Sequence, residues 1–195
     1  MTKLIGLEKT PAMTLYIDQN AKTGNSARAE VKKKINERAK RYNDYVKTQD
    51  NPNLLFLKSI IYTEELIKEI IRDIYGNNIK TEAMTLGRAM EYIKVFNDDE
   101  FVKKSIDLLT IIKKTRDKMA HELEFDINEC VSFWNTVSNH SSGQKTSTNS
   151  NNLSNKQRCV AINEYFSDVI HGFLYIKTGM EVIPDFIKHK NSSTQ

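Results

Sequence analysis

The feature that most constrains the fold is a run of apolar residues between positions 54 and 74 that recur at steps of three and four. This spacing is typical of a buried α-helix, and no stretch of the chain sustains the alternation of a strand. Asn51 and Pro52 provide a start signal for this helix, and Gly76 provides a stop. The run comprises Leu54, Leu55, Leu57, Ile60, Ile61, Leu66, Ile67, Ile70, Ile71 and Ile74.

Other helices are predicted by the same periodicity along the rest of the chain. Seven Gly and three Pro in 195 residues also argue against a chain built from strands and tight turns. The expected helices cover residues 26–47 after a Ser26 cap, 84–96, about 100–123 after an Asn97-Asp98-Asp99 cap, 127–137, and 156–177 before a stop at Gly179. The sequence therefore predicts an all-α bundle of about five to six helices.

The domain boundaries are predicted from the places where the helical spacing of apolar residues stops. Residues 1–25 are expected to form a flexible arm, 26–180 a single helical domain and 181–195 a tail. Residues 140–155 are a polar, low-complexity segment, which we expect to be a mobile loop within the domain.

Composition excludes several classes of protein. No apolar run approaches the roughly 18 residues of a membrane span, and the start of the chain lacks the character of a secretory signal. Cys130 and Cys159 are expected to be free thiols in a cytoplasmic protein. Phosphate-binding and zinc-binding motifs are absent, and the four histidines are scattered, so we expect no metal and no cofactor. The histidines are His121, His140, His171 and His189.

The net charge of +4 hides a basic segment at 26–47, where eight basic residues stand against three acids. Such a helix permits contact with nucleic-acid phosphates, and it is also what a solvated helix face looks like. The sequence leaves both interpretations open.

Candidate chemistry is concentrated between Lys113 and Leu123, where Arg116 and His121 stand five residues apart. The spacing alone is uninformative, since four His and seven Arg in such a chain give about one accidental pair in seven sequences. On an ideal helix Asp117 and His121 share a side, while Arg116 lies about 140° from His121. Arg116 is thus expected nearer the edge of the buried stripe, and the polar triplet is expected to face away from the principal core, towards solvent or a partner subunit. A shared site then requires a long reach by Arg116, a local distortion or a second copy of the helix.

The segment Arg116-Asp117-Lys118-Met119-Ala120-His121 resembles the signature of the HEPN superfamily, in which Arg and a polar residue precede His. Thr85-Leu86-Gly87-Arg88 is also similar to some members. The resemblance covers residues 50–180. It implies a helical bundle that forms a homodimer with the two motifs facing each other. Many members are metal-independent endoribonucleases of toxin–antitoxin or phage-defence systems, whereas others are inactive scaffolds or nucleotide-binding modules.

The residue types allow RNA cleavage because RNA carries its own nucleophile, the 2′-hydroxyl. Histidine is the side-chain type suited to proton transfer near neutral pH, which makes His121 the candidate acid or base, and Arg116 presents a charged donor fork to phosphate oxygens. Asp117 is expected either to orient these side chains or to be ordinary helix surface. Lys113, Lys114 and Lys118 are candidate RNA contacts. The alternative is a non-catalytic regulatory, adaptor or RNA-binding dimer that uses the same face. An antitoxin or other regulatory protein is a further expected partner.

Overall fold

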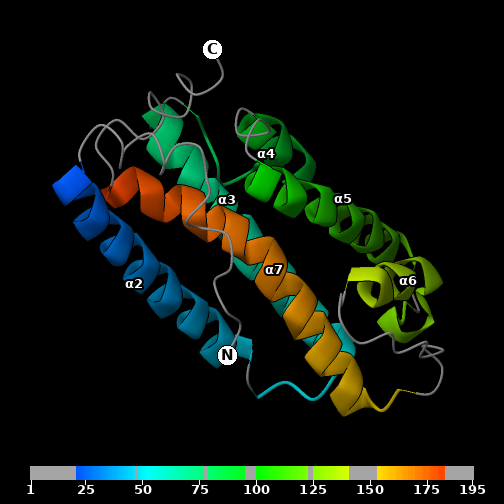
Figure 1. The fold of residues 1–195 in the computed structure, drawn as a ribbon. Coiled ribbons are helices and arrows are strands. Elements are labelled where there is room, and N and C mark those ends of the chain that lie inside the picture. Colours follow the sequence, from blue (N-terminus) through cyan, green and yellow to red (C-terminus); the bar gives the residue numbers. More distant parts are fainter. Residues whose placement is uncertain are drawn as a thin grey trace.

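The structure, a computed structural model, describes residues 21–46, 48–76, 79–94, 100–122, 125–140 and 153–182. The regular elements in this part of the chain are all helices, with no strand, which confirms the predicted all-α bundle (Figure 1). Its elements are α2 (Ala21–Val46), α3 (Pro52–Tyr75), α4 (Leu86–Ile93), α5 (Glu100–His121), the 3-10 helix η4 (Ile127–Glu129), α6 (Val131–His140) and α7 (Asn155–Val182).

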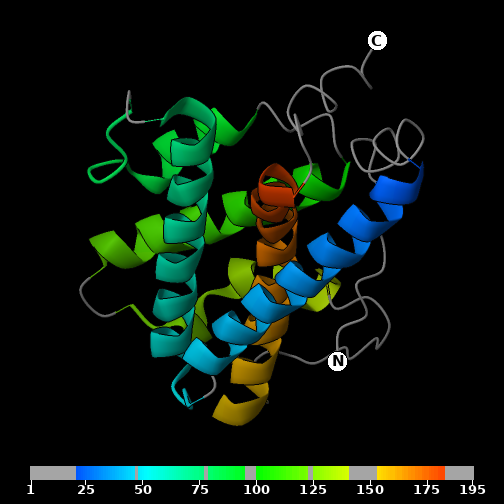
Figure 2. The same ribbon diagram turned by 90° about the vertical axis from the view of Figure 1, so that its left-hand side faces the viewer.

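Helix α7 is the centre of the bundle. It packs against α2, α3 and α5, and Figures 1 and 2 show it running between α2 and the other helices. It is apolar on most sides, as expected for a helix surrounded by others. Its buried residues are Cys159, Ile162, Tyr165, Phe166, Val169, Ile170, Gly172, Phe173, Leu174, Tyr175, Ile176, Thr178 and Gly179.

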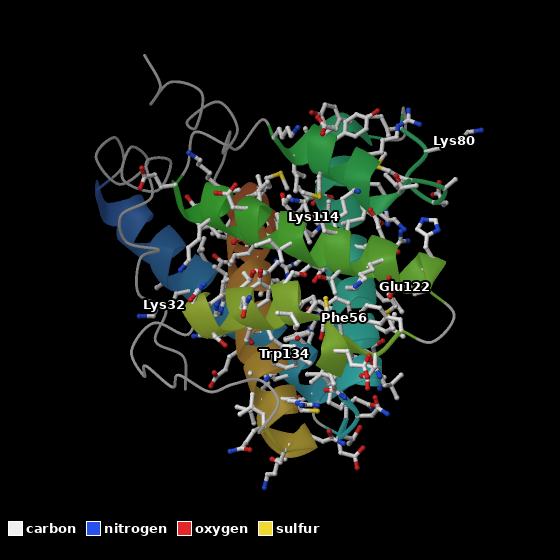
Figure 3. The ribbon with its side chains drawn as sticks, turned by 90° about the vertical axis from the view of Figure 1, so that its right-hand side faces the viewer. Lys32, Phe56, Lys80, Lys114, Glu122 and Trp134 are labelled. Atoms are coloured by element: carbon white, nitrogen blue, oxygen red, sulfur yellow. The ribbon has the colours of Figure 1, made fainter. Side chains whose placement is uncertain are left out.

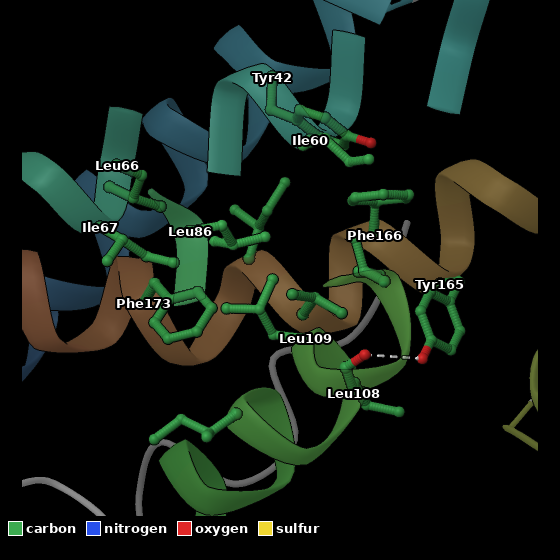
Figure 4. Close-up of a cluster of buried hydrophobic side chains, with 14 of the residues drawn as sticks. Tyr42, Ile60, Leu66, Ile67, Leu86, Leu108, Leu109, Tyr165, Phe166 and Phe173 are labelled. Carbon is green, nitrogen blue, oxygen red and sulfur yellow. Dashed lines mark hydrogen bonds between the residues drawn. The ribbon is translucent and has the colours of Figure 1, made fainter. Parts of the chain in front are cut away.

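Aromatic side chains join α3, α6 and α7 in the core. The ring of Phe56 meets Phe133 and Phe166 edge to face, with centroids 5.2 and 5.6 Å apart. Such arrangements are favourable beyond the area they bury. Tyr165 completes the cluster, and its hydroxyl donates a 3.1 Å hydrogen bond to the carbonyl of Leu108 in α5 (Figure 4).

The ends of α3 are those that the sequence predicts. The Asn51 side chain accepts a hydrogen bond from the Leu54 amide at 3.1 Å, and Pro52 occupies the first turn. Gly76 ends the helix with a positive φ of 65°, a backbone conformation that residues other than glycine rarely adopt. Most of the apolar residues predicted for this helix are buried, as expected, whereas Leu54, Leu57 and Ile61 lie on its exposed side.

Three boundaries differ from the sequence predictions. Helix α2 begins at Ala21, upstream of the expected Ser26 cap, and residues 127–137 divide into η4 and α6. The Trp134 indole donates to the Ile127 carbonyl at 2.7 Å, which stabilises that division. Helix α7 continues through Gly179 to Val182 because Gly179 is buried against its neighbours, so tertiary packing overrides the local stop signal.

Several predicted features lie outside the described residues. These are the cap at 97–99, most of the arm at 1–25, most of the polar loop at 140–155 and residues 183–195 of the tail. Among the described residues, Cys130 and Cys159 are buried free thiols. No helix within the described ranges is long and apolar enough to cross a membrane.

The basic excess of α2 is partly neutralised by ion pairs. Lys34 and Arg38 both pair with Glu181 of α7, and Arg38 also donates to Thr178. Lys40 pairs with Asp44 on the helix itself. These contacts show that part of the charge serves the α2–α7 interface, and a phosphate contact by the remaining cations stays a prediction.

Helix α5 runs across the bundle, and its C-terminal turns lie beside α3 (Figure 2). The segment that follows α5 is fixed to the start of α3 by Asn53. The side-chain amide of Asn53 donates to Asp126 at 3.1 Å, and its oxygen accepts from the Ile127 amide at 2.7 Å. This clamp holds the motif-bearing end of α5 next to α3.

We predict that Phe56→Ala lowers the free energy of unfolding by about 3–5 kcal/mol, because it empties the centre of the aromatic cluster. Ile61→Ala on the same helix is the matched control. Ile61 is 54% exposed, so its loss is expected to cost less than about 1 kcal/mol. Urea unfolding followed by circular dichroism measures both, and equal losses contradict the assigned core.

Candidate functional site

Three of the predicted site residues form a connected cluster on α5. The Lys113 ammonium contacts the Asp117 carboxylate at 2.6 Å, one turn along the helix. The Arg116 Nη1 atom donates to the other Asp117 oxygen at 3.3 Å. All three side chains are half-buried. Asp117 is therefore held between two cations rather than standing alone on the helix surface.

Arg116 lies at the edge of the buried face of α5, with 39% of its side chain exposed, and points towards α3. It follows the fully buried Leu109 and Ile112 by seven and four residues, so it continues their face of the helix. Leu109 and Ile112 are covered by neighbouring helices, whereas Arg116 meets Glu64 of α3, with its Nη2 atom 4.0 Å from Oε1 of Glu64. The predicted surface arginine is thus an inter-helix contact.

Glu64 is a site residue that the sequence analysis missed. Its Oε1 atom is shut off from solvent and has no hydrogen-bond partner, and Arg116 is the cation it faces among the described residues. Glu64 lies four residues after Ile60 and three before Ile67, both buried. A carboxylate at the edge of an apolar helix face was the available signal, since such groups are rarely buried unless paired.

His121 is exposed and is the last residue of α5. Among the described residues, no hydrogen bond or ion pair joins it to Arg116 or Asp117. Lys114 and Lys118 are also exposed, and the Nζ atom of Lys118 lies 3.7 Å from Oε1 of Glu122. In Figure 3, Lys114 and Glu122 mark the course of α5 towards its C-terminal end. The structure gathers Lys113, Arg116 and Asp117, and it leaves His121, Lys114 and Lys118 open to solvent.

Helix α4 supports the cluster through Gly87. A Cβ atom at this position would lie 2.8 Å from Cε of Lys113, so glycine leaves room for the lysine stem. The Thr85 side chain caps α4 by accepting from the Arg88 amide at 3.4 Å. The Thr85-Leu86-Gly87-Arg88 segment therefore positions Lys113, and through it Asp117.

The electrostatics of the cluster are balanced. The hydrogen bond from Lys113, assisted by the Arg116 guanidinium, holds the pKa of Asp117 below its usual range. Asp117 is consequently ionised at neutral pH. Two cations, Lys113 and Arg116, face two carboxylates, Glu64 and Asp117, so an incoming anion must compete with these carboxylates for Arg116.

Other chemistry finds less support in the described residues. They contain no group of three His, Cys, Asp or Glu side chains arranged to hold a metal ion. Burial lowers the pKa of His171 on α7, so this imidazole is neutral at pH 7. Comparisons of the chain with protein-family models, with curated proteins and with solved structures found no match.

We predict that Gly87→Ala raises the pKa of Asp117 towards its ordinary value, because the new methyl group displaces Lys113 from the carboxylate. Stability should change by no more than about 1 kcal/mol, since a lysine stem moves easily and alanine favours the helix. Carboxyl NMR titration measures the pKa. Lys113→Met removes the same donor and sets the expected size of the shift. An Asp117 pKa that moves in Lys113→Met and not in Gly87→Ala contradicts the packing role of Gly87.

Proposed function

We propose that this protein is a HEPN-like, metal-independent endoribonuclease whose site forms between two copies of the chain. One observation carries the proposal. A half-buried Arg116, flanked by carboxylates from two helices, lies on the same helix as the exposed His121. This pairs a positively charged donor for a phosphate with an accessible proton-transfer group.

The residues suit cleavage by the RNA's own 2′-hydroxyl. His121 is open to solvent, so it can approach that hydroxyl or the leaving oxygen and transfer the proton. The guanidinium of Arg116 stabilises the negative charge that develops on the phosphate oxygens. Asp117 accepts hydrogen bonds from Lys113 and Arg116 and thereby orients the arginine. Exposed Lys114 and Lys118 add positive charge along the path of an RNA strand.

A second copy is part of the proposal because Arg116 turns towards α3 while His121 lies exposed at the C-terminal end of α5. The exposed Leu54, Leu57 and Ile61 on α3 favour a protein contact near the site, since clustered apolar side chains at a surface mark interfaces. We further propose that the protein acts in the cytoplasm as a toxin or phage-defence effector, restrained by an antitoxin or other regulatory protein.

A non-catalytic adaptor or RNA-binding dimer is the second candidate. It is favoured by the charge balance at Arg116, where the carboxylates of Glu64 and Asp117 already lie beside the guanidinium. In that case Arg116 and His121 serve self-association or partner binding, and the wild-type protein cuts no RNA.

We predict that purified protein cuts RNA in the presence of a chelator and leaves 2′,3′-cyclic phosphate or 3′-phosphate ends. His121→Ala should lower the rate by about 100-fold or more, because it removes the proton-transfer group. His140→Ala, which also removes one imidazole, is the matched control and should retain the rate. Undiminished cleavage by His121→Ala, in preparations cleared of contaminating nuclease, contradicts the assignment. An inactive wild type whose self-association is weakened by His121→Ala favours the adaptor.

A further inference from the structure

The Glu64 carboxylate has one oxygen atom that is buried and unpaired. Its Oε1 atom has no hydrogen bond and no access to solvent, although the side chain as a whole is 18% exposed. Leaving such an oxygen unpaired costs free energy, so native structures contain few of them and each calls for an explanation. Its neighbours on α3 offer none, because Ile60 and Ile67 are apolar and Glu65 points to Lys68 and Arg72 instead.

The group that faces Glu64 is Arg116. The 4.0 Å between Nη2 and Oε1 is close enough for an ion pair and too long for a hydrogen bond. A shift of about 1 Å would bring the two atoms into hydrogen-bond range. On its other side, Arg116 reaches Asp117 through Nη1 at 3.3 Å, beyond the usual length of a charge-assisted bond. Arg116 is thus shared between two carboxylates and held tightly by neither.

We propose that Glu64 is the positioning residue for Arg116, an inference that rests on the proposed RNA cleavage. When a phosphodiester binds, it competes with Asp117 for the guanidinium, since both are anionic acceptors. Glu64 then takes the Nη2 donor in a full hydrogen bond and fixes the plane of the guanidinium. Because Glu64 belongs to α3 and Arg116 to α5, the contact sets the arginine relative to the body of the protein and not merely to its own helix.

The positioning role predicts a particular kinetic effect. Glu64 touches Arg116 and does not itself meet the substrate, so losing its charge should misorient the guanidinium in the transition state more than it weakens RNA binding. Glu64→Gln is expected to lower kcat by about 10-fold or more while KM changes by less than about 3-fold. Glu65→Gln is the matched control, since it removes the adjacent, exposed carboxylate, and it should leave both constants unchanged.

A spectroscopic readout separates positioning from mere stability. The side-chain ¹⁵Nε–¹H signal of Arg116, assigned by its loss in Arg116→Lys, should shift in Glu64→Gln and stay in place in Glu65→Gln. An Arg116 signal that Glu64→Gln leaves unmoved overturns the inference, even in an active enzyme. A wild-type protein that cuts no RNA overturns the proposed function, and with it the positioning role, whatever the signal does.

Thermal unfolding keeps the contact testable if Glu64→Gln folds poorly. Arg116→Gln leaves the Glu64 oxygen facing no cation and should lower Tm. Adding Glu64→Gln to Arg116→Gln removes that uncompensated charge, so the double variant should be more stable than Arg116→Gln alone. Losses of Tm that simply add contradict a direct interaction between the two side chains.

Discussion

The burial of α7 on most of its sides is the constraint on which the rest of the structure depends. A helix that carries aromatic and aliphatic side chains around most of its circumference is stable only when other helices surround it. Each such side chain contributes about 1.5–3 kcal/mol when it leaves water. Helices α2, α3 and α5 provide this cover. Ion pairs from Lys177 to Asp73 and from Arg38 to Glu181 then tie α7 to α3 and α2 at one end.

The position of the candidate site follows from that arrangement. Helix α5 covers α7 with its earlier turns, where the Tyr165 hydroxyl bonds to the Leu108 carbonyl. Its last turns lie beside α3 instead, held there by the Asn53 clamp on the following segment. The face of α5 that packs apolar residues against α7 in the earlier turns therefore carries Arg116 in the last turns. There Arg116 meets Glu64 of α3. In the protein without RNA, Arg116 is neutralised, and the proposed reaction begins when a phosphate displaces one of its carboxylates.

Local patterns predicted the helices well because the periodicity, the Asn51-Pro52 start and the Gly76 stop each act on residues only a few positions away. They failed at Gly179, where burial against other helices outweighs a local stop signal. The contact of Arg116 with α3 was not predicted because an angle on one helix does not reveal which partner covers each turn. Glu64 was missed because its role as a site residue depends on its contact with Arg116, a residue far along the chain. The sequence could name Arg116, Asp117 and His121, but only the packing of α5 on α3 shows that Arg116 meets Glu64.

The central claim is that Arg116 and His121 act together across two copies of the chain, and complementation tests it most directly. Arg116→Ala and His121→Ala, each inactive alone, are unfolded together and refolded as a mixture. Our account predicts that the mixture recovers chelator-resistant RNA cleavage, because mixed dimers combine the intact Arg116 of one copy with the intact His121 of the other. A mixture as inactive as its components, beside a wild type that stays active at dilutions where it is monomeric, would contradict it.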